Sequence, residues 1–404
     1  MAEQGAGRVL VIGAGIGGLT LAHALVRVGI DVRVYEADDA AGDRFQGYRI
    51  GLGRATIDAL RATLPGRLAE LVEATSGSLT GPGLLFDERL NVLSRDLEGP
   101  PEDARAVDRQ VLRRILLGAL GDRIAYGKRL TSHAETEDGT VIARFADGTE
   151  AAGQVLVGAD GGNSRVRRQL VPQVRLVDSD LCGAMGRTPV ADRFLRLVPG
   201  RGTMIKGPGI TLMLGRMQFD REPSEAAAAL APELAMPYRE SYVRWVLMVP
   251  PEHPAATGPR REDAREVVLD LIDGWHPDLL DLVRSSDMSG IGRSRVFDRP
   301  MPSWPVSRVT LLGDAAHLTL ASGGNGANTA MWDAVLLAER LAEVERGERD
   351  LASALGEYQA GLLQRGNAAV EYSKENLKRF VPAQAATPRQ TTASPVGRAE
   401  DADR

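Results

Sequence analysis

Residues 9–36 read VLVIGAGIGGLTLAHALVRVGIDVRVYE and carry a Gly-x-Gly-x-x-Gly pattern between two short apolar runs. The pattern predicts a strand, a tight turn, one amphipathic helix and a second strand, which is the order of a dinucleotide-binding βαβ unit. Gly13 permits the turn, Gly15 lets a pyrophosphate approach the backbone, and Gly18 lets the helix pack close to the strand. Gly29 is placed to end the helix. The unpaired amides at the helix start would face the pyrophosphate.

An acidic residue closes the second strand of this unit. Glu36 stands where a ribose hydroxyl needs an acceptor, and it favours an unphosphorylated ribose, as in NAD or FAD. The pattern does not separate nicotinamide from flavin, and strand, glycine turn and helix also occur as plain packing units in α/β proteins. The residues expected to contact the nucleotide are Gly13, Gly15, Ile16, Gly17, Gly18, Glu36 and Ala37.

Composition narrows the class of protein. A chain of 404 residues can bury a large core and form more than one structural unit. The net charge is −5, and no basic run with interleaved aromatic residues is present, so a nucleic-acid partner is not expected. The single cysteine, Cys182, and five scattered histidines argue against disulfides and against a metal site. No signal or membrane-spanning segment is apparent, which predicts a soluble cytoplasmic protein; its oligomeric state stays open.

Apolar runs and turn signals predict how the chain is divided. Residues 1–174 are expected to form a nucleotide-binding domain that includes a β-meander, with parallel strands at 154–158 and again at 309–312. The long separation between these strands implies an inserted mixed sheet at 175–300. Further expected elements are a loop at 37–53, helices at 55–64, 66–74, 109–120 and 262–272, and strands at 182–187, 210–217, 242–249 and 291–297. Residues 301–380 would complete the first domain and add two helices at 327–345 and 351–378, whereas 381–404 is expected to be a disordered tail.

Three further segments carry polar residues beside glycines. The first is VGADGGNSR at 157–165, where Asp160 ends a strand and can accept amides at a helix start, so a simply capped turn is an equal alternative. The second is RVTLLGDAAH at 308–317, followed by GGNGAN at 323–328. The third is VDRQ at 107–110, in which Arg109 opens a helix.

Together these segments resemble the class A FAD-dependent monooxygenases, the para-hydroxybenzoate hydroxylase-like flavoproteins. The resemblance implies an α/β fold with a Rossmann-like FAD domain of the glutathione-reductase type, an inserted mixed β-sheet that holds the substrate, and C-terminal helices. It implies that Asp314 contacts the flavin ribityl chain and that Arg109 contacts the flavin or its phosphates. Arg49 is a candidate to face flavin or substrate. The other residues implied in FAD binding are Asp160, Gly161, Gly313, Gly324, Gly326, Ala327 and Asn328.

The same resemblance implies a reaction. NAD(P)H, a transient co-substrate, would reduce FAD, and a C4a-hydroperoxyflavin formed with O2 would hydroxylate or epoxidise a hydrophobic aromatic or polycyclic small molecule of secondary metabolism. An adaptable apolar lining is suggested by the following residues, although ordinary core positions are the simpler interpretation: Met185, Met204, Met213, Met217, Trp245 and Met248.

Some residues leave alternatives open. Relatives carry a proline between the positions of His317 and Gly323, whereas this chain reads LTLAS at 318–322, which is compatible with altered chemistry or with a similar backbone path. His317 itself is expected to be a hydrogen-bonded structural residue rather than a catalytic one. A flavin-dependent halogenase, a flavin reductase of prenyl chains and a catalytically silent flavin-binding protein are the alternative functions.

Overall fold

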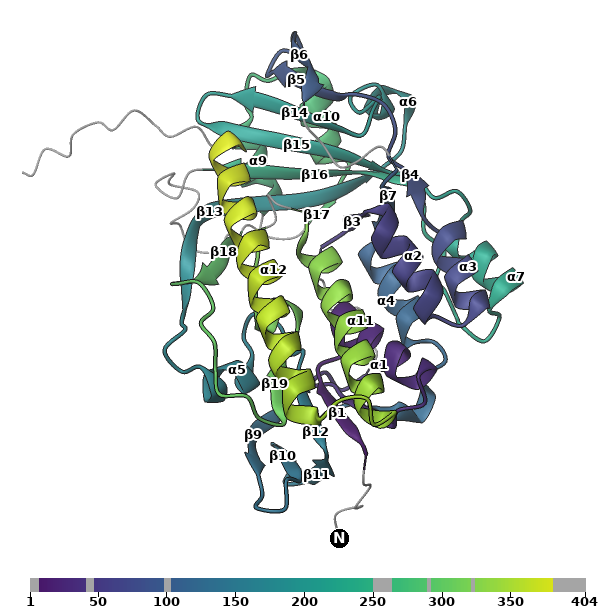
Figure 1. The fold of residues 1–404 in the computed structure, drawn as a ribbon. Helices are drawn as coiled ribbons and strands as arrows, with labels where there is room; N and C mark the ends of the chain where they lie inside the picture. The colour runs from purple at the N-terminus through teal and green to yellow at the C-terminus, as the bar shows by residue number, and fades with distance from the viewer. Residues whose placement is uncertain are drawn as a thin grey trace, which may run out of the picture.

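Two β-sheets at opposite ends of a pair of long helices form the framework of the protein. The computed structural model describes residues 7–40, 47–97, 103–249, 264–288, 292–320 and 324–380. Figure 1 shows a parallel sheet at one end and a mixed sheet at the other, with α11 (Gly326–Glu345) and α12 (Leu351–Phe380) running between them. No helix in these ranges is both long enough and apolar enough to cross a membrane.

The parallel sheet is the predicted nucleotide-binding framework. Its strand order is β19-β12-β1-β2-β8, and every neighbouring pair runs parallel. The central strand reads VLVI and is buried throughout, as expected for a strand with both faces covered. The bounds of these strands are β1 (Val9–Ile12), β2 (Val32–Tyr35), β8 (Ile124–Ala125), β12 (Val155–Gly158) and β19 (Val309–Leu311).

Helices and a small antiparallel sheet pack around these strands. Helix α1 (Ile16–Arg27) is followed by Gly29 with a φ of 82°, the left-handed conformation that ends a helix, as predicted. Helix α5 (Arg165–Leu170) follows β12. The predicted β-meander is present, and Phe145 stacks on Tyr35 of the parallel sheet with ring centroids 4.8 Å apart. The meander consists of β9 (Leu130–Glu135), β10 (Val141–Phe145) and β11 (Glu150–Gly153).

The mixed sheet has eight strands. Its main order is β17-β13-β16-β15-β14-β5-β6, and β18 also pairs with β13. Only β14 and β5 run parallel; the other pairs are antiparallel. The strands are β5 (Gly83–Asp87), β6 (Val92–Leu97), β13 (Leu176–Pro189), β14 (Gly202–Gly207), β15 (Ile210–Met217), β16 (Tyr242–Val249), β17 (Asp287–Met288) and β18 (Gly292–Phe297).

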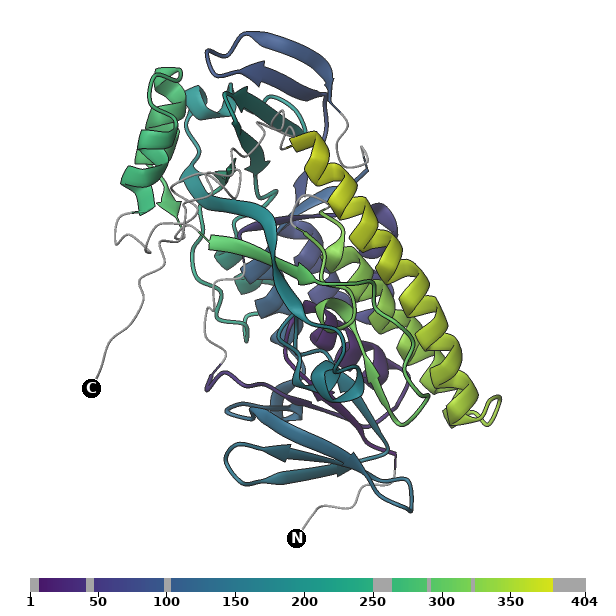
Figure 2. The same ribbon diagram turned by 90° about the vertical axis from the view of Figure 1, so that its left-hand side faces the viewer.

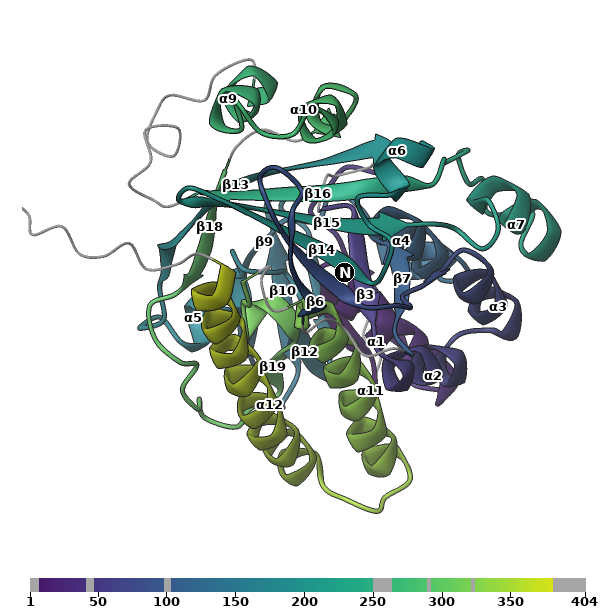
Figure 3. The ribbon, with the colours of Figure 1, turned by 90° about the horizontal axis from the view of Figure 1, so that it is seen from above.

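The mixed sheet has two different faces. Its outer face packs on α9 (Ala264–Leu271), α10 (Pro277–Arg284) and α6 (Asp192–Leu195) through a buried cluster that includes Trp245 and Cys182. Figure 3 shows α9 and α10 on the side of this sheet that faces away from α11 and α12. The inner face is turned toward the parallel sheet, because Met248 packs with Leu320 and with Leu377 of α12.

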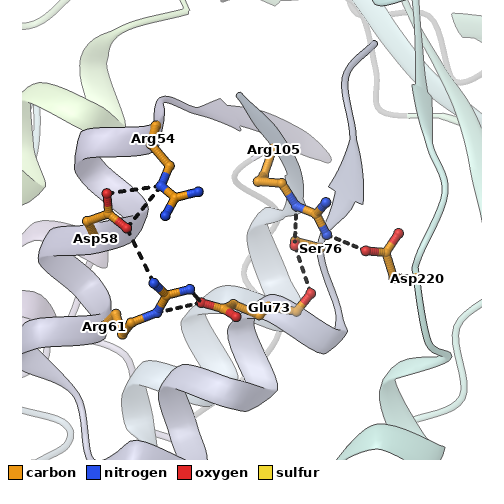
Figure 4. Close-up of polar contacts among 7 residues, drawn as sticks. All are labelled: Arg54, Asp58, Arg61, Glu73, Ser76, Arg105 and Asp220. Carbon is orange, nitrogen blue, oxygen red and sulfur yellow. Dashed lines mark hydrogen bonds and ion pairs between the residues drawn. The ribbon is translucent and has the colours of Figure 1, made fainter. Parts of the chain in front are cut away.

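A three-stranded antiparallel sheet, ordered β3-β7-β4, joins the two large sheets. It consists of β3 (Arg49–Leu52), β4 (Gly77–Ser78) and β7 (Arg105–Asp108), and it lies beside α2 (Arg54–Thr63), α3 (Gly66–Ala74), α4 (Arg109–Leu117) and α7 (Pro223–Leu230). Arg105 of β7 donates to Ser76 Oγ at 2.9 Å and pairs with Asp220, just beyond β15 (Figure 4). Arg61 of α2 pairs with Glu73 of α3. Because at least one partner of each ion pair is exposed to solvent, each pair adds little stability.

Several elements differ from the sequence prediction. Residues 49–52 form β3 instead of loop, because the backbone pairs with β7, with Arg49 opposite Asp108. Helix α4 ends at Leu117, three residues early, because Gly118 is extended. Strands β5 and β6 join the mixed sheet although they precede residue 175, and Figure 2 shows their hairpin at the end of the molecule opposite the meander. The expected tail at 381–404, part of the loop at 37–53 and the first residues of the helix expected at 262–272 lie outside the described ranges.

Candidate functional site

The glycine turn after β1 contains two kinds of glycine. Gly13 and Gly18 are required by close packing, whereas Gly15 is not. Gly13 has a φ of 110°, and a methyl group there would lie 2.5 Å from the carbonyl oxygen of Ala159. A methyl group at Gly18 would lie 2.2 Å from the Gly13 carbonyl oxygen, so α1 packs directly on the turn. A methyl group at Gly15 would meet no heavy atom within 4 Å. The space in front of Gly15 is therefore open, as close approach of a ligand to the backbone requires.

Backbone amides at the start of α1 are available to an anion. Gly15 is the N-cap residue and has no side chain to cap the helix. The first helical hydrogen bond runs from the Leu19 amide to the Gly15 carbonyl at 2.9 Å, so the amides of the preceding turn have no partner within the helix. No acidic side chain lies in this turn. A phosphate placed here would be stabilised by the amides and the helix dipole. Ile16 and Gly17 belong to the same turn, and Gly17 packs on Leu312.

Glu36 lies at the carboxyl end of β2, beside this turn. Its Oε2 accepts from the Ala14 amide at 2.7 Å and its Oε1 accepts from the Asp38 amide at 3.0 Å. Each carboxylate oxygen has a second lone pair, so the group can also accept from ribose hydroxyls. Ala37 follows directly and is partly buried.

Arg113 also belongs to this part of the site, and the sequence prediction missed it. Its Nε donates to the Ala14 carbonyl at 3.1 Å, and its guanidinium lies 4.0 Å from Glu36. The sequence feature that could have identified Arg113 is its position one helical turn after Arg109, which places both arginines on the same face of α4.

Arg109 and Asp314 face one another at the carboxyl edge of the parallel sheet. Arg109 is the first residue of α4, and its Nε is buried without a hydrogen-bond partner. Asp314 follows β19 in a short 3-10 turn. Burial raises the pKa of Asp314, and Arg109 opposes that rise; burial lowers the pKa of Arg109, and Asp314 opposes that fall. Within the described ranges neither side chain has a hydrogen bond or close ion pair, so both are available to a polar ligand.

Asp160 closes β12 next to the glycine turn. Its Oδ2 accepts from the Arg165 amide at 2.6 Å, which caps the start of α5. The capped turn expected as the alternative is therefore present. Its Oδ1 is nevertheless buried without a partner, and burial raises the pKa of this carboxyl. Gly161 follows with a φ of 71°. Asp160 therefore combines a structural bond with a free acceptor.

The start of α11 approaches Asp314. A methyl group at Gly326 would lie 2.6 Å from Thr319 Oγ1 and 3.7 Å from Asp314 Oδ1, so a larger residue would require Thr319 to shift. Gly313 and Gly324 both adopt positive φ angles, of 62° and 64°. Asn325 caps this helix without a side-chain hydrogen bond. The helix start thus presents amides close to a buried carboxylate.

Asn328, near the start of α11, braces the helix. Its Oδ1 accepts from the Gly53 amide at 3.1 Å, and its Nδ2 donates to the Gly51 carbonyl at 2.9 Å, which ties α11 to β3 and α2. Ala327 precedes it and is partly buried. Residues 321–323, with Gly323 and the position where relatives carry proline, lie outside the described ranges.

His317 is a buried, hydrogen-bonded residue, as the sequence predicted. Its Nε2 lies 2.5 Å from Asp333 Oδ2, and Arg365 donates to Asp333 Oδ1 at 3.0 Å. Burial is the largest single effect and disfavours the charged ring, but the hydrogen bond to Asp333 and the charges of Asp333 and Asp314 together outweigh burial and raise the pKa of His317. The three side chains hold the segment after Asp314 against α11 and α12.

The residues suggested as an adaptable apolar lining do not all share one face. Met185, Met213 and Met248 lie together on the inner face of the mixed sheet with Val246 and Leu320. Met204 pairs with Met213 across the ladder and so shares this face. Trp245 was wrongly included, because alternation along β16 turns it to the outer face, where it is fully buried. Met217 belongs to the core around the parallel sheet.

Arg49 lies at the edge of this inner face. A methyl group at Gly215 would lie 2.0 Å from Arg49 Nη1 and 3.4 Å from Arg244 Nη2, so the two guanidinium groups converge over that glycine. Sequence reasoning did not find Arg244, because only the register between β15 and β16 brings it opposite Gly215.

The glycine turn, Glu36 and the methionine-rich inner face of the mixed sheet all lie within the range that one family model matches. The family model described as an FAD binding domain matches residues 7–373, and the chain belongs to this family. The resemblance to class A FAD-dependent monooxygenases predicted from the sequence is thereby confirmed. The structure also offers what FAD needs: free helix amides and an acceptor at one end, and orphaned polar groups at Arg109 and Asp160.

Similar proteins have been named as monooxygenases. The dual O-methyltransferase/FAD-dependent monooxygenase CTB3 of Cercospora beticola is 32% identical, over 92% of this chain and 46% of that relative. This chain therefore spans about half the length of that protein. A solved structure from Photorhabdus luminescens, assigned as an FAD-containing monooxygenase, is 30% identical with a TM-score of 0.78, covering 93% of this chain and 98% of that one. HpxO of Klebsiella pneumoniae, solved with FAD and uric acid, is 25% identical with a TM-score of 0.74, covering 93% and 89%.

Proposed function

We propose that this chain is an FAD-dependent monooxygenase that uses NAD(P)H and O2 to hydroxylate or epoxidise a hydrophobic aromatic or polycyclic small molecule. The observation that carries the proposal is that contacts join three features of the fold. Arg113 of α4, the helix that begins with Arg109, donates to the Ala14 carbonyl in the open glycine turn, and Leu320, six residues after Asp314, packs with the methionine-rich inner face. Relatives named as monooxygenases support the reaction type.

Each part of the site has a task in this proposal. When bound, FAD supplies the electron transfer from NAD(P)H to O2. The start of α1 and Glu36 would hold the adenosine diphosphate half, and Asp314, Arg109 and the start of α11 would hold the flavin half. Positive helix ends favour negative charge on a reduced ring. The inner face would position an aromatic molecule and keep water away from it.

The residues proposed to hold FAD come from several separate segments of the chain. Backbone contacts are proposed at the two glycine turns and at the start of α11, and side-chain contacts at the acids and arginines. The full set is Gly13, Gly15, Ile16, Gly17, Gly18, Glu36, Ala37, Arg109, Asp160, Gly161, Gly313, Asp314, Gly324, Gly326, Ala327 and Asn328. Arg49 stays the candidate to face either flavin or substrate. The bonds of Asn328 to Gly51 and Gly53 make bracing its main contribution.

The proposal also divides the chain into functional units. Residues 1–174 and 301–380 would hold FAD, and residues 175–300 would hold the substrate. The hairpin of β5 and β6 adds to the substrate sheet through the parallel pairing of β5 with β14.

The test is made on the purified protein. FAD content is read from absorbance, and NADH or NADPH oxidation and O2 consumption are followed across a panel of aromatic and polycyclic compounds. Products are analysed by mass after reaction under ¹⁸O2. One ¹⁸O atom in a product is the expected result. A reduced product without added oxygen would indicate a reductase, and a halide-dependent product would indicate a halogenase. Full FAD occupancy without oxidation of NAD(P)H would indicate a silent binding protein. Each of these results contradicts the proposal.

A further inference from the structure

Two arginines on the inner face lack acidic partners. Arg49 and Arg244 are partly buried, and the Nε atom of each is buried without a hydrogen bond. Two other charged side chains nearby have partners: Arg187 bonds Asp287 at 2.9 Å, and Asp108 accepts from the Tyr242 hydroxyl at 2.8 Å. Within the described ranges, no carboxylate lies within 4 Å of either Arg49 or Arg244.

Their positions follow from the fold. Arg244 lies opposite Gly215 on β15 and opposite Arg187 on β13, so all three share the inner face. Arg49 comes from β3 and enters the space that a side chain at position 215 would fill. Two cations are thus brought together from separate sheets over a glycine.

This arrangement has an electrostatic cost. Burial lowers the pKa of Arg49 to about 9, and repulsion from Arg244 and Arg216 adds to this effect, whereas Tyr242 opposes it. Burial likewise lowers the pKa of Arg244. Arginine side chains stay protonated in proteins, and a desolvated cation is stabilised by an opposite charge with matching hydrogen-bond acceptors. The chain supplies no such group here among its described residues.

We propose that Arg49 and Arg244 together bind an anionic oxygen group of the aromatic substrate, such as a carboxylate. This inference rests on the proposed function, and it names the chemical class of the substrate. Guanidinium groups match the two oxygens of a carboxylate in charge and in geometry.

The neighbouring residues define the rest of the molecule. Val246 and Met213 lie two positions along their strands from Arg244 and Gly215, on the same face. Two residues of a strand span about 7 Å. The ligand is therefore an aromatic body that packs on Met185, Met213 and Val246, with its anionic group about 7 Å away.

The test uses one matched pair of probes, naphthalene-2-carboxylate and its neutral analogue naphthalene-2-carboxamide. Equilibrium dialysis measures the affinity of each for the FAD-loaded protein, and the change in flavin absorbance gives a second readout. Arg49→Gln and Arg244→Gln are compared with the wild type. Arg144→Gln is the matched control, because Arg144 is an exposed residue of the meander that pairs with Glu150.

The wild type and the control should bind the carboxylate at least roughly tenfold more tightly than the amide, the equivalent of one charge-assisted hydrogen bond. Either glutamine variant should remove this preference while leaving the affinity for the amide within about twofold. Arg49→Lys and Arg244→Lys keep the charge and should retain part of the preference, which also controls for misfolding.

Three results would overturn the inference. The first is equal binding of both probes by the wild type, and the second is equal weakening of both probes in Arg244→Gln. The third is a loss of FAD or NADPH affinity with an unchanged carboxylate preference. Each would show that the arginines serve another purpose. Failure of the monooxygenase assignment looks different, because the protein would then lack FAD or fail to oxidise NAD(P)H, whatever its preference between the probes.

Discussion

The hydroxyl of Tyr242 donates a hydrogen bond of 2.8 Å to Oδ2 of Asp108, 134 residues earlier in the chain. The other carboxylate oxygen of Asp108 accepts from the amides of Gln110 and Val111 and so caps α4. One buried carboxylate therefore connects the first strand residue of β16 to the helix that begins with Arg109. Through it, the mixed sheet and the proposed flavin site are held in a fixed relation.

Replacing Tyr242 with Phe should destabilise the protein by about 1.5 to 3 kcal/mol, because a hydrogen bond to a buried charged group is lost. Chemical denaturation with an unchanged m-value gives this difference. Tyr238→Phe is the control, since the Tyr238 side chain is exposed, and it should change stability by less than about 0.5 kcal/mol. Equal small effects in both variants would show that the 2.8 Å contact adds no stability.

Two glycines of the turn should respond in opposite ways to alanine. Gly18→Ala places a methyl group 2.2 Å from a backbone carbonyl and should destabilise the apoprotein by about 1 to 3 kcal/mol. Gly15→Ala meets only open space, so apoprotein stability should change by less than about 0.5 kcal/mol, while FAD affinity falls roughly tenfold or more. Thermal unfolding of the apoprotein and FAD titration separate the two effects. Normal FAD binding by Gly15→Ala would refute the ligand role of Gly15.

Asp314→Ala should weaken FAD binding by about 1 to 3 kcal/mol, because an acceptor for ribityl hydroxyls or backbone amides is lost. The apoprotein should not lose stability at pH 7, since burial raises the pKa of Asp314 and its charge is therefore costly in the folded state. Flavin fluorescence during titration measures the affinity. Asp147→Ala, on the exposed meander, is the control and should bind FAD normally. Unchanged affinity in Asp314→Ala would leave Asp314 without a role in flavin binding.

The pair of His317 and Asp333 predicts a pH-dependent part of the stability. The folded pKa of His317 is raised above its ordinary value of 6.5, so the stabilisation is fully present below pH 6.5 and is lost as the pH rises through the folded pKa. His317→Gln should cost about 1.5 to 3 kcal/mol at pH 6, and the difference from the wild type should shrink at alkaline pH. Unfolding free energies measured from pH 6 to pH 9 test this. A difference in unfolding free energy that grows with pH would contradict this prediction, because it would mean that folding lowers the pKa of His317.

Local sequence patterns predicted the strand, glycine turn, helix and second strand of residues 9–36 well. The strand, turn and helix of residues 9–36 depend on backbone conformation and on contacts between near neighbours, and both are encoded by the positions of Gly13 and Gly18. The strands at 210–217 and 242–249 were also predicted to the residue, because each is an apolar run of ordinary strand length.

Long-range register could not be read in the same way. Alternation along β16 shows that Trp245 and Val246 point to opposite faces, but not which face meets the flavin side. Arg244 meets Arg49 only because β15 aligns Gly215 between them. The pairing of β5 with β14 joins residues more than a hundred positions apart, and no pattern in either strand specifies that partner.

The last prediction concerns how substrate controls the reaction. The cluster of Met213, Met248 and Leu320 joins the inner face of the mixed sheet to the segment that follows Asp314. A ligand packed on this cluster contacts both units, so its binding should shift the population toward the arrangement in which NAD(P)H is oxidised.

Oxidation should therefore be slow with NAD(P)H alone and faster with a true substrate. An aromatic mimic that fits but cannot be oxygenated should also speed oxidation, with hydrogen peroxide as the product. Stopped-flow absorbance and a peroxide assay measure both. Equal rates with and without every ligand, while one oxygen atom from O2 still enters a product, would retain the oxygenase assignment and refute control by occupancy.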